Sequence, residues 1–164
     1  MCPSHRLPEP CPNDDSPGAK AFWVFAHAAW EQSEAREILL RWQDERGIDV
    51  MFVLFACWYP CRLSADEWDT LRSGARDWNR RITRRVRALR RRIDRLDWPQ
   101  GYQACLRLEL GAERIEAAWL VKAGTVHTPT DHPKPDLRRR LHRLFPELPA
   151  SEIDTLLQAL TGKP

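Results

Sequence analysis

Residues 64–96 read SADEWDTLRSGARDWNRRITRRVRALRRRIDRL, and this stretch decides the fold class. It opens with a capping box, in which the Ser64 and Glu67 side chains each satisfy a backbone N–H group at the start of a helix. Its later apolar residues recur every three or four positions, which places them in one stripe along a helix: Trp78, Ile82, Val86, Leu89, Ile93 and Leu96. The stretch therefore predicts one long amphipathic helix.

The segments on either side also have helical periods. We expect three helices before this stretch and three after it: residues 19–32, 33–46, 50–59, 99–123, 136–145 and 151–160. The apolar run at residues 50–55 would fit a buried strand equally well, and its helical neighbours favour a helix. With no convincing sheet, the sequence predicts an all-α protein, a single compact bundle of six to seven helices.

The distribution of proline predicts how the chain is organised. At 164 residues the chain has the size of one domain. Residues 1–18 carry five prolines and few large apolar groups, which is typical of a disordered tail. We expect a helical core domain at residues 19–124, a proline-containing linker at 125–135 and short C-terminal helices at 136–164.

Cysteine usage and hydropathy indicate the cellular compartment. The five cysteines are an odd number, and no charged and apolar leader opens the chain, so no disulfide framework or secretion is expected. The longest apolar run, residues 50–60, is well short of the roughly 20 residues that span a bilayer. The sequence predicts a reduced, cytoplasmic protein without a membrane partner.

Positive charge is concentrated in one part of the chain. The net charge is +3, yet residues 76–95 hold ten arginines and two aspartates, a local net charge of +8. We predict a basic surface on this helix, formed by Arg80, Arg84, Arg87, Arg91 and Arg95. Such a surface can contact nucleic-acid phosphates, dock on an acidic protein, or simply face solvent and pair with nearby acids.

Three acids interrupt an apolar face of the following helix. Glu109, Glu113 and Glu116 are spaced i, i+4 and i+7, and buried carboxylates of this kind are paired, bind metal or have raised pKa values. We expect pairing with Arg85, Arg87 or Arg92. The predicted interior polar cluster consists of Gln43, Asp49, Arg85, Glu109, Glu113 and Glu116. Because the Glu-x-x-His pattern of carboxylate-bridged metal bundles is missing, we expect neither a metal nor a cofactor.

Several motifs in this order resemble a family of short proteobacterial proteins of unknown function. The resemblance covers roughly residues 22–121, and these motifs carry it: Phe22-Trp23-x-Phe25, Trp42-Gln43-Asp44-x-x-Gly47-x-Asp49-Val50, Leu54-Phe55-x-x-Trp58, Trp78, Arg87-x-Leu89-Arg90-Arg91 and Glu109-Leu110-x-Ala112-Glu113-Arg114-x-Glu116. The sequence departs from the family at Met51, where asparagine is usual, and at Arg85 and Val86, where proline and leucine are usual. The resemblance implies a small helical cytoplasmic protein and adds no chemistry.

Two classes of function follow from these features. The first is a non-catalytic protein that binds another macromolecule through the arginine-rich helix. We expect this macromolecule to be a protein, with nucleic acid as the alternative. The second is a small enzyme or ligand-binding protein with a carboxylate-lined pocket. Convergence of the acids with Gln43 and Asp49 on a cavity would favour the second class, and an arginine partner for each acid would favour the first.

Overall fold

The computed structural model describes residues 16–124 and 135–162, and within these ranges it contains helices and no strand. The all-α prediction is confirmed. The elements in chain order are α1 (Pro17–Glu31), α2 (Ser33–Arg46), α3 (Val50–Trp58), α4 (Ala65–Trp78), the π-helical turn η1 (Asn79–Thr83), α5 (Arg84–Arg92), α6 (Pro99–Gly124), α7 (Leu137–Leu144) and α8 (Ala150–Thr161). The predicted tail and linker lie almost wholly outside the described residues, so the domain boundaries stay predictions.

The helix ends follow from local hydrogen bonding. Ser64 Oγ accepts from the Glu67 amide at 3.3 Å, and Glu67 Oε2 accepts from the Ser64 amide at 2.5 Å, which completes the predicted capping box. Asp49 Oδ1 accepts from the amides of Met51 and Phe52 and so caps α3. Gly47 ends α2 with a φ of 65°, in the left-handed region that favours glycine.

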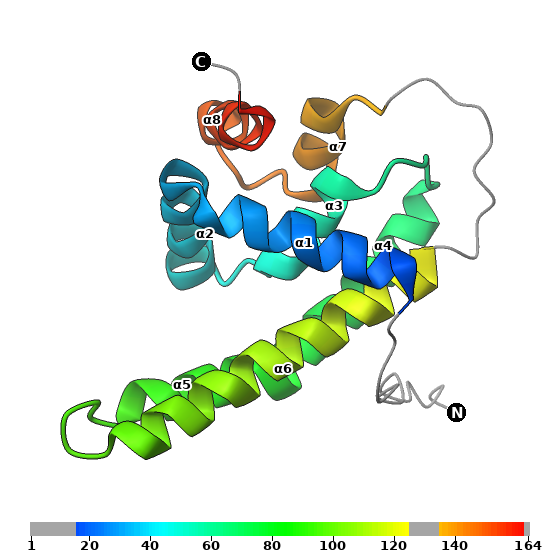
Figure 1. Ribbon diagram of the computed structural model, residues 1–164. Coiled ribbons are helices and arrows are strands. Elements are labelled where there is room, and N and C mark those ends of the chain that lie inside the picture. Colours follow the sequence, from blue (N-terminus) through cyan, green and yellow to red (C-terminus); the bar gives the residue numbers. More distant parts are fainter. Residues whose placement is uncertain (1–15, 125–134, 163–164) are drawn as a thin grey trace.

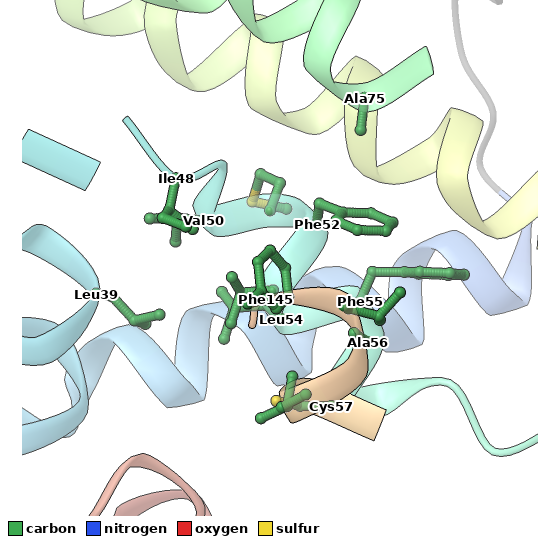
Figure 2. Packing of buried hydrophobic residues seen from close by; sticks show 14 of the residues in the cluster. Leu39, Ile48, Val50, Phe52, Leu54, Phe55, Ala56, Cys57, Ala75 and Phe145 are labelled. Atoms are coloured by element: carbon green, nitrogen blue, oxygen red, sulfur yellow. The ribbon is translucent and has the colours of Figure 1, made fainter. Parts of the chain in front are cut away.

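Helix α3 lies at the centre of the molecule. Residues 50–57 are all buried, because α3 packs against α1, α2, α6 and α7. Figure 2 shows its side chains among those of Leu39 from α2, Ala75 from α4 and Phe145 at the end of α7. The apolar run that fitted a strand or a helix is therefore a helix, and it is buried on all sides.

Helices α5 and α6 form a long antiparallel hairpin that extends away from the bundle (Figure 1). At the other end of α6, Gly74 in α4 lies against the indole of Trp119, which fills the space that a Cβ atom would need. Helices α7 and α8 pack on the opposite side of the molecule, against α3 and α2 respectively. The base of the hairpin therefore packs in the core, and the turn between α5 and α6 lies outside it.

The π-helical turn changes which face of the long helix points inward. A π turn closes i to i+5 hydrogen bonds, so it holds one residue more than an α turn and shifts every later residue by one position. Beyond Trp78 the predicted stripe is wrong at Leu89 and Leu96, which are 53% and 89% exposed, whereas its other later members are only half-buried: Ile82, Val86 and Ile93. Buried Thr83 and Arg87 take the inward places expected for Ile82 and Val86. The helix also ends at Arg92 instead of continuing to Leu96.

Candidate functional site

A cluster of charged side chains lies where α3 begins, between α5 and α6. Glu109, Glu113 and Glu116 project from one face of α6, as their spacing predicts. Asp49 precedes the first residue of α3, and the π turn brings Arg87 of α5 to the same place. The cluster therefore combines residues from three parts of the chain.

Arg87 joins two of the glutamates. Its Nε donates to Glu109 Oε1 at 2.6 Å, and its Nη2 donates to Glu113 Oε1 at 3.0 Å. Arg90 Nε donates to Glu109 Oε2 at 2.6 Å, and Arg90 Nη1 donates to the hydroxyl of Tyr102 at 3.2 Å. Burial alone would raise the pKa of Glu109, but the hydrogen bonds from Arg90 and Arg87 outweigh it, and the pKa lies below its usual value. Glu109 is thus a fully paired carboxylate.

Glu113 is paired more weakly than Glu109. Arg87 contacts only its Oε1, and no second hydrogen bond to its carboxylate occurs within the described residues. Its side chain is 22% exposed. Burial, together with the charges of Glu109 and Asp49, raises the pKa of Glu113 to about 7 against the attraction of Arg87. Glu113 therefore changes its charge near neutral pH.

Asp49 and Glu116 form a buried pair of acids. Asp49 Oδ2 and both carboxylate oxygens of Glu116 are buried and accept no hydrogen bond from an N–H or hydroxyl group of the described residues. The two carboxyls interact with each other, so a proton held on one of them supplies the missing donor. Burial raises the pKa of both, and the neighbouring charge of Asp49 adds to the rise at Glu116. Burial and mutual repulsion therefore favour a proton on this pair over two ionised carboxylates.

A cleft of about 280 Å³ opens beside this cluster. Its apolar wall includes Trp23 and Trp30 of α1, Leu54 of α3, and Leu106 and Leu110 of α6. Its polar side consists of His27, Gln43, Arg87, Arg90, Arg91, Glu109 and Glu113. The cleft is slightly smaller than usual ligand pockets, and it combines a largely apolar lining with a few converging polar groups.

The predicted interior cluster is brought together in most of its members. Glu109 and Glu113 share Arg87, and Gln43 lines the same cleft. Glu116 and Asp49 form the buried pair behind them. Arg85 is the exception, because the shift at the π turn leaves it exposed on the outer side of α5.

The predicted basic surface also loses one member. Arg80, Arg84, Arg91 and Arg95 are exposed, whereas Arg87 is buried. Arg91 pairs with Asp44 at 2.5 Å, and Arg80 pairs with Asp77 at 2.9 Å. The sequence also did not identify Arg90 and Tyr102 as parts of the site. The one-residue shift at the π turn moved Arg90 inward, whereas Tyr102, seven residues before Glu109, could have been found because it lies on the same helix face as the glutamates.

Replacing Glu113 with glutamine should change how stability depends on pH. A carboxyl whose pKa is raised on folding stabilises the folded state below its unfolded pKa of 4.5, and this contribution is lost as pH rises towards 7. As pH rises from 5 to 8, the free energy of unfolding of Glu113→Gln should therefore increase by about 2 to 3 kcal/mol relative to that of the wild type. Urea unfolding at both pH values measures this. Parallel profiles, or an equal gain for the exposed control Glu37→Gln, would contradict the assignment.

Two further features bear on the class of site. The acids, histidines and cysteines within residues 16–124 and 135–162 form no group that could hold a metal ion. No helix in that same part of the chain is long and apolar enough to cross a membrane.

Comparison with known proteins gives one family. The model of a family described as "Protein of unknown function (DUF2390)" matches residues 21–120, a range that includes every residue of the charged cluster. Searches of the curated proteins and of the solved structures found no match.

Proposed function

The chain belongs to this DUF2390 family, whose function is unknown, and we propose from its own site that it binds a small organic cation in the cleft between α1, α3 and α6. The ligand class is an amine with an apolar or aromatic body. The observation that carries the proposal is the Glu113 carboxyl, which is half-paired, partly exposed and located opposite an apolar wall.

The balance of charge supports a cationic ligand. The acids at the site are Asp49, Glu109, Glu113 and Glu116, and the guanidinium groups of Arg87 and Arg90 contact only Glu109 and Glu113 among them. Four acids thus face two guanidiniums, and the raised pKa values of Asp49, Glu113 and Glu116 reflect the cost of holding this excess of negative charge without a further cation. An ammonium group beside Glu113 would replace the proton on that carboxyl and restore its charge.

The wall of the cleft supports the apolar part of the ligand. Trp23 and Trp30 line the cleft together, and both are partly exposed. The faces of tryptophan rings attract cations and also stack on apolar groups. The described acids offer no group that could hold a metal ion, which favours an organic cation over an inorganic one.

A series of matched small molecules tests this function. Phenethylamine should bind and raise the melting temperature, whereas 2-phenylethanol, which has the same ring and chain, should do neither. Because Glu113 must lose its proton to bind the amine, affinity should fall about tenfold from pH 8 to pH 6. Isothermal titration calorimetry measures both effects.

A matched pair of variants locates the binding. Glu113→Gln should abolish binding of the amine, and the exposed control Glu37→Gln should leave it unchanged. Equal binding of the alcohol would show a merely apolar cleft, and a lack of binding by both probes at pH 8 would overturn the proposal.

A second candidate function is contact with a macromolecule through the arginine-rich helix, a protein partner or nucleic acid. It is favoured by Arg81, Arg84, Arg85 and Arg92, which are exposed and have no ion pair within the described residues. It is weakened by the pairing of Arg87, Arg90 and Arg91 with acids of this chain. Binding of mixed-sequence RNA that weakens steeply with salt would identify the nucleic-acid form of this function.

A further inference from the structure

A second hollow lies on the other side of Gln43 from the cleft. It has a volume of about 560 Å³ and lies between the end of α2, the α4 to α5 helix and the segment that follows α7. Five arginines line it: Arg46, Arg72, Arg76, Arg80 and Arg84. Of the acids of the amine site, Glu109 and Glu113 line the cleft, whereas Asp49 lines this hollow.

The π turn aligns four of these arginines. Arg72 and Arg84 are twelve residues apart, which in a straight α-helix is about three and a third turns, so they would point about 120° apart. One additional residue in η1 reduces this to about three turns, an offset of roughly 20°. Arg72, Arg76, Arg80 and Arg84 therefore form one row along the hollow, with a rise of about 6 Å from each to the next.

The ion pairs that these arginines form leave part of their positive charge available to bind an anion. Arg76 and Arg84 form no ion pair within the described part of the chain. Arg72 and Arg80 pair with Asp69 and Asp77, one turn earlier on their own helix, in pairs at 2.8 and 2.9 Å that are partly exposed. Such exposed pairs contribute 1 kcal/mol or less and can be exchanged for a stronger anion.

The acids in the hollow do not neutralise the row. Asp44 is paired with Arg91, and Asp49 caps α3 and interacts with Glu116. The other acids that line the hollow are the exposed Glu45 and Glu147. Because they line the hollow itself, they limit how much negative charge it can accept, which argues for a short anionic ligand.

We propose that this hollow binds the oligophosphate group of a small molecule. Guanidinium groups recognise phosphoryl oxygens through paired, charge-assisted hydrogen bonds, and several guanidiniums in a row match several linked phosphoryl groups. The volume is within the usual range for small-molecule sites. The site is separate from the amine site and does not depend on it.

Inorganic tripolyphosphate is the probe, with orthophosphate as its single-phosphate counterpart. In calorimetry with the full chain, tripolyphosphate should bind at least tenfold more tightly than orthophosphate, because it reaches more than one arginine of the row. The double variant Arg76→Gln/Arg84→Gln should weaken binding by tenfold or more. The control Arg81→Gln/Arg85→Gln removes the same charge from exposed positions outside the hollow and should change binding by less than twofold.

Three results would overturn the proposal. The first is no binding of tripolyphosphate at low salt. The second is an equal loss in both double variants, which would indicate a diffuse electrostatic attraction. The third is tighter binding of a mixed-sequence RNA oligonucleotide that displaces tripolyphosphate, which would assign the row to nucleic acid. Binding of phenethylamine should be unchanged in both double variants, so failure here is distinguishable from failure of the amine site.

Discussion

Replacing Arg140 with methionine should lower the free energy of unfolding by about 3 to 5 kcal/mol. Arg140 lies in α7 and is only 7% exposed. Its Nη1 donates to the carbonyl oxygens of Ala56 and Tyr59 at 2.8 and 2.6 Å, and its Nη2 donates to that of Cys61 at 2.9 Å. The guanidinium also lies over the Trp68 ring, 5.0 Å from its centroid. Methionine fills similar space and leaves these carbonyls without donors.

Chemical denaturation of the full chain measures this loss. Arg139→Met is the matched control, because Arg139 is the adjacent residue and is exposed. The control should change stability by less than about 0.5 kcal/mol. Arg140→Lys should fall between the two, since an ammonium group can reach fewer carbonyls than the guanidinium fork. A loss below 1 kcal/mol for Arg140→Met would show that water replaces the guanidinium at the end of α3.

The role of Arg140 illustrates what the sequence could not provide. The helix that carries it was predicted, because apolar residues recur at helical spacing and Asp136 and Pro146 mark its limits. The partners of Arg140 are backbone carbonyls about 80 residues earlier, and they are free because Pro60 and the end of α3 leave them without helical donors. Backbone acceptors carry no residue identity, so no pattern could indicate them.

The charged cluster was more predictable than its arginine partner. The spacing of Glu109, Glu113 and Glu116 placed them on one helix face, and Asp49 was expected in the same interior cluster. The identity of the arginine depended on a shift of one residue, which moved Arg87 inward and Arg85 outward. A π turn depends on the packing of α4 and α5 against α6, so a helical wheel drawn for one helix cannot reveal it.

The same turn also connects the two proposed sites. It places Arg87 between the acids of α6, and it aligns Arg72, Arg76, Arg80 and Arg84 along the second hollow. Restoring a regular α-helix there would rotate α5 and disturb both sites together. This shared dependence is consistent with the frequent occurrence of π turns at functional sites.

Replacing Arg87 with methionine should destabilise the protein strongly, and more at high pH than at low pH. The guanidinium binds Glu109 and Glu113, and its loss leaves Glu109 with Arg90 alone and Glu113 with no guanidinium among the described residues, beside the buried acids Asp49 and Glu116. Removing one partner of a buried ion pair costs about 3 to 5 kcal/mol, which we expect at pH 8. Near pH 5 the loss should be smaller, because the acids whose pKa values rise in the variant take up protons.

The sign of this pH dependence follows from linkage. Without Arg87, both folded-state pKa values should rise: that of Glu113 further above its unfolded value, and that of Glu109 from its lowered position in the wild-type protein. A raised carboxyl pKa stabilises the folded state at low pH, and that stabilisation disappears as pH rises through the folded pKa. Urea unfolding at pH 5 and pH 8 measures the difference. The exposed Arg85→Met is the control and should cost less than about 1 kcal/mol at either pH.

A double variant shows whether the loss comes from unpaired acids. Adding Glu113→Gln to Arg87→Met removes one of the carboxyls that lost its partner, so the combined loss at pH 8 should be smaller than the sum of the two single effects. Strictly additive effects would mean that Arg87 stabilises the protein through packing alone. A loss of equal size at pH 5 and pH 8 would mean that the acids of α6 already hold protons in the wild-type protein, and Glu113 would then carry no charge with which to bind an amine.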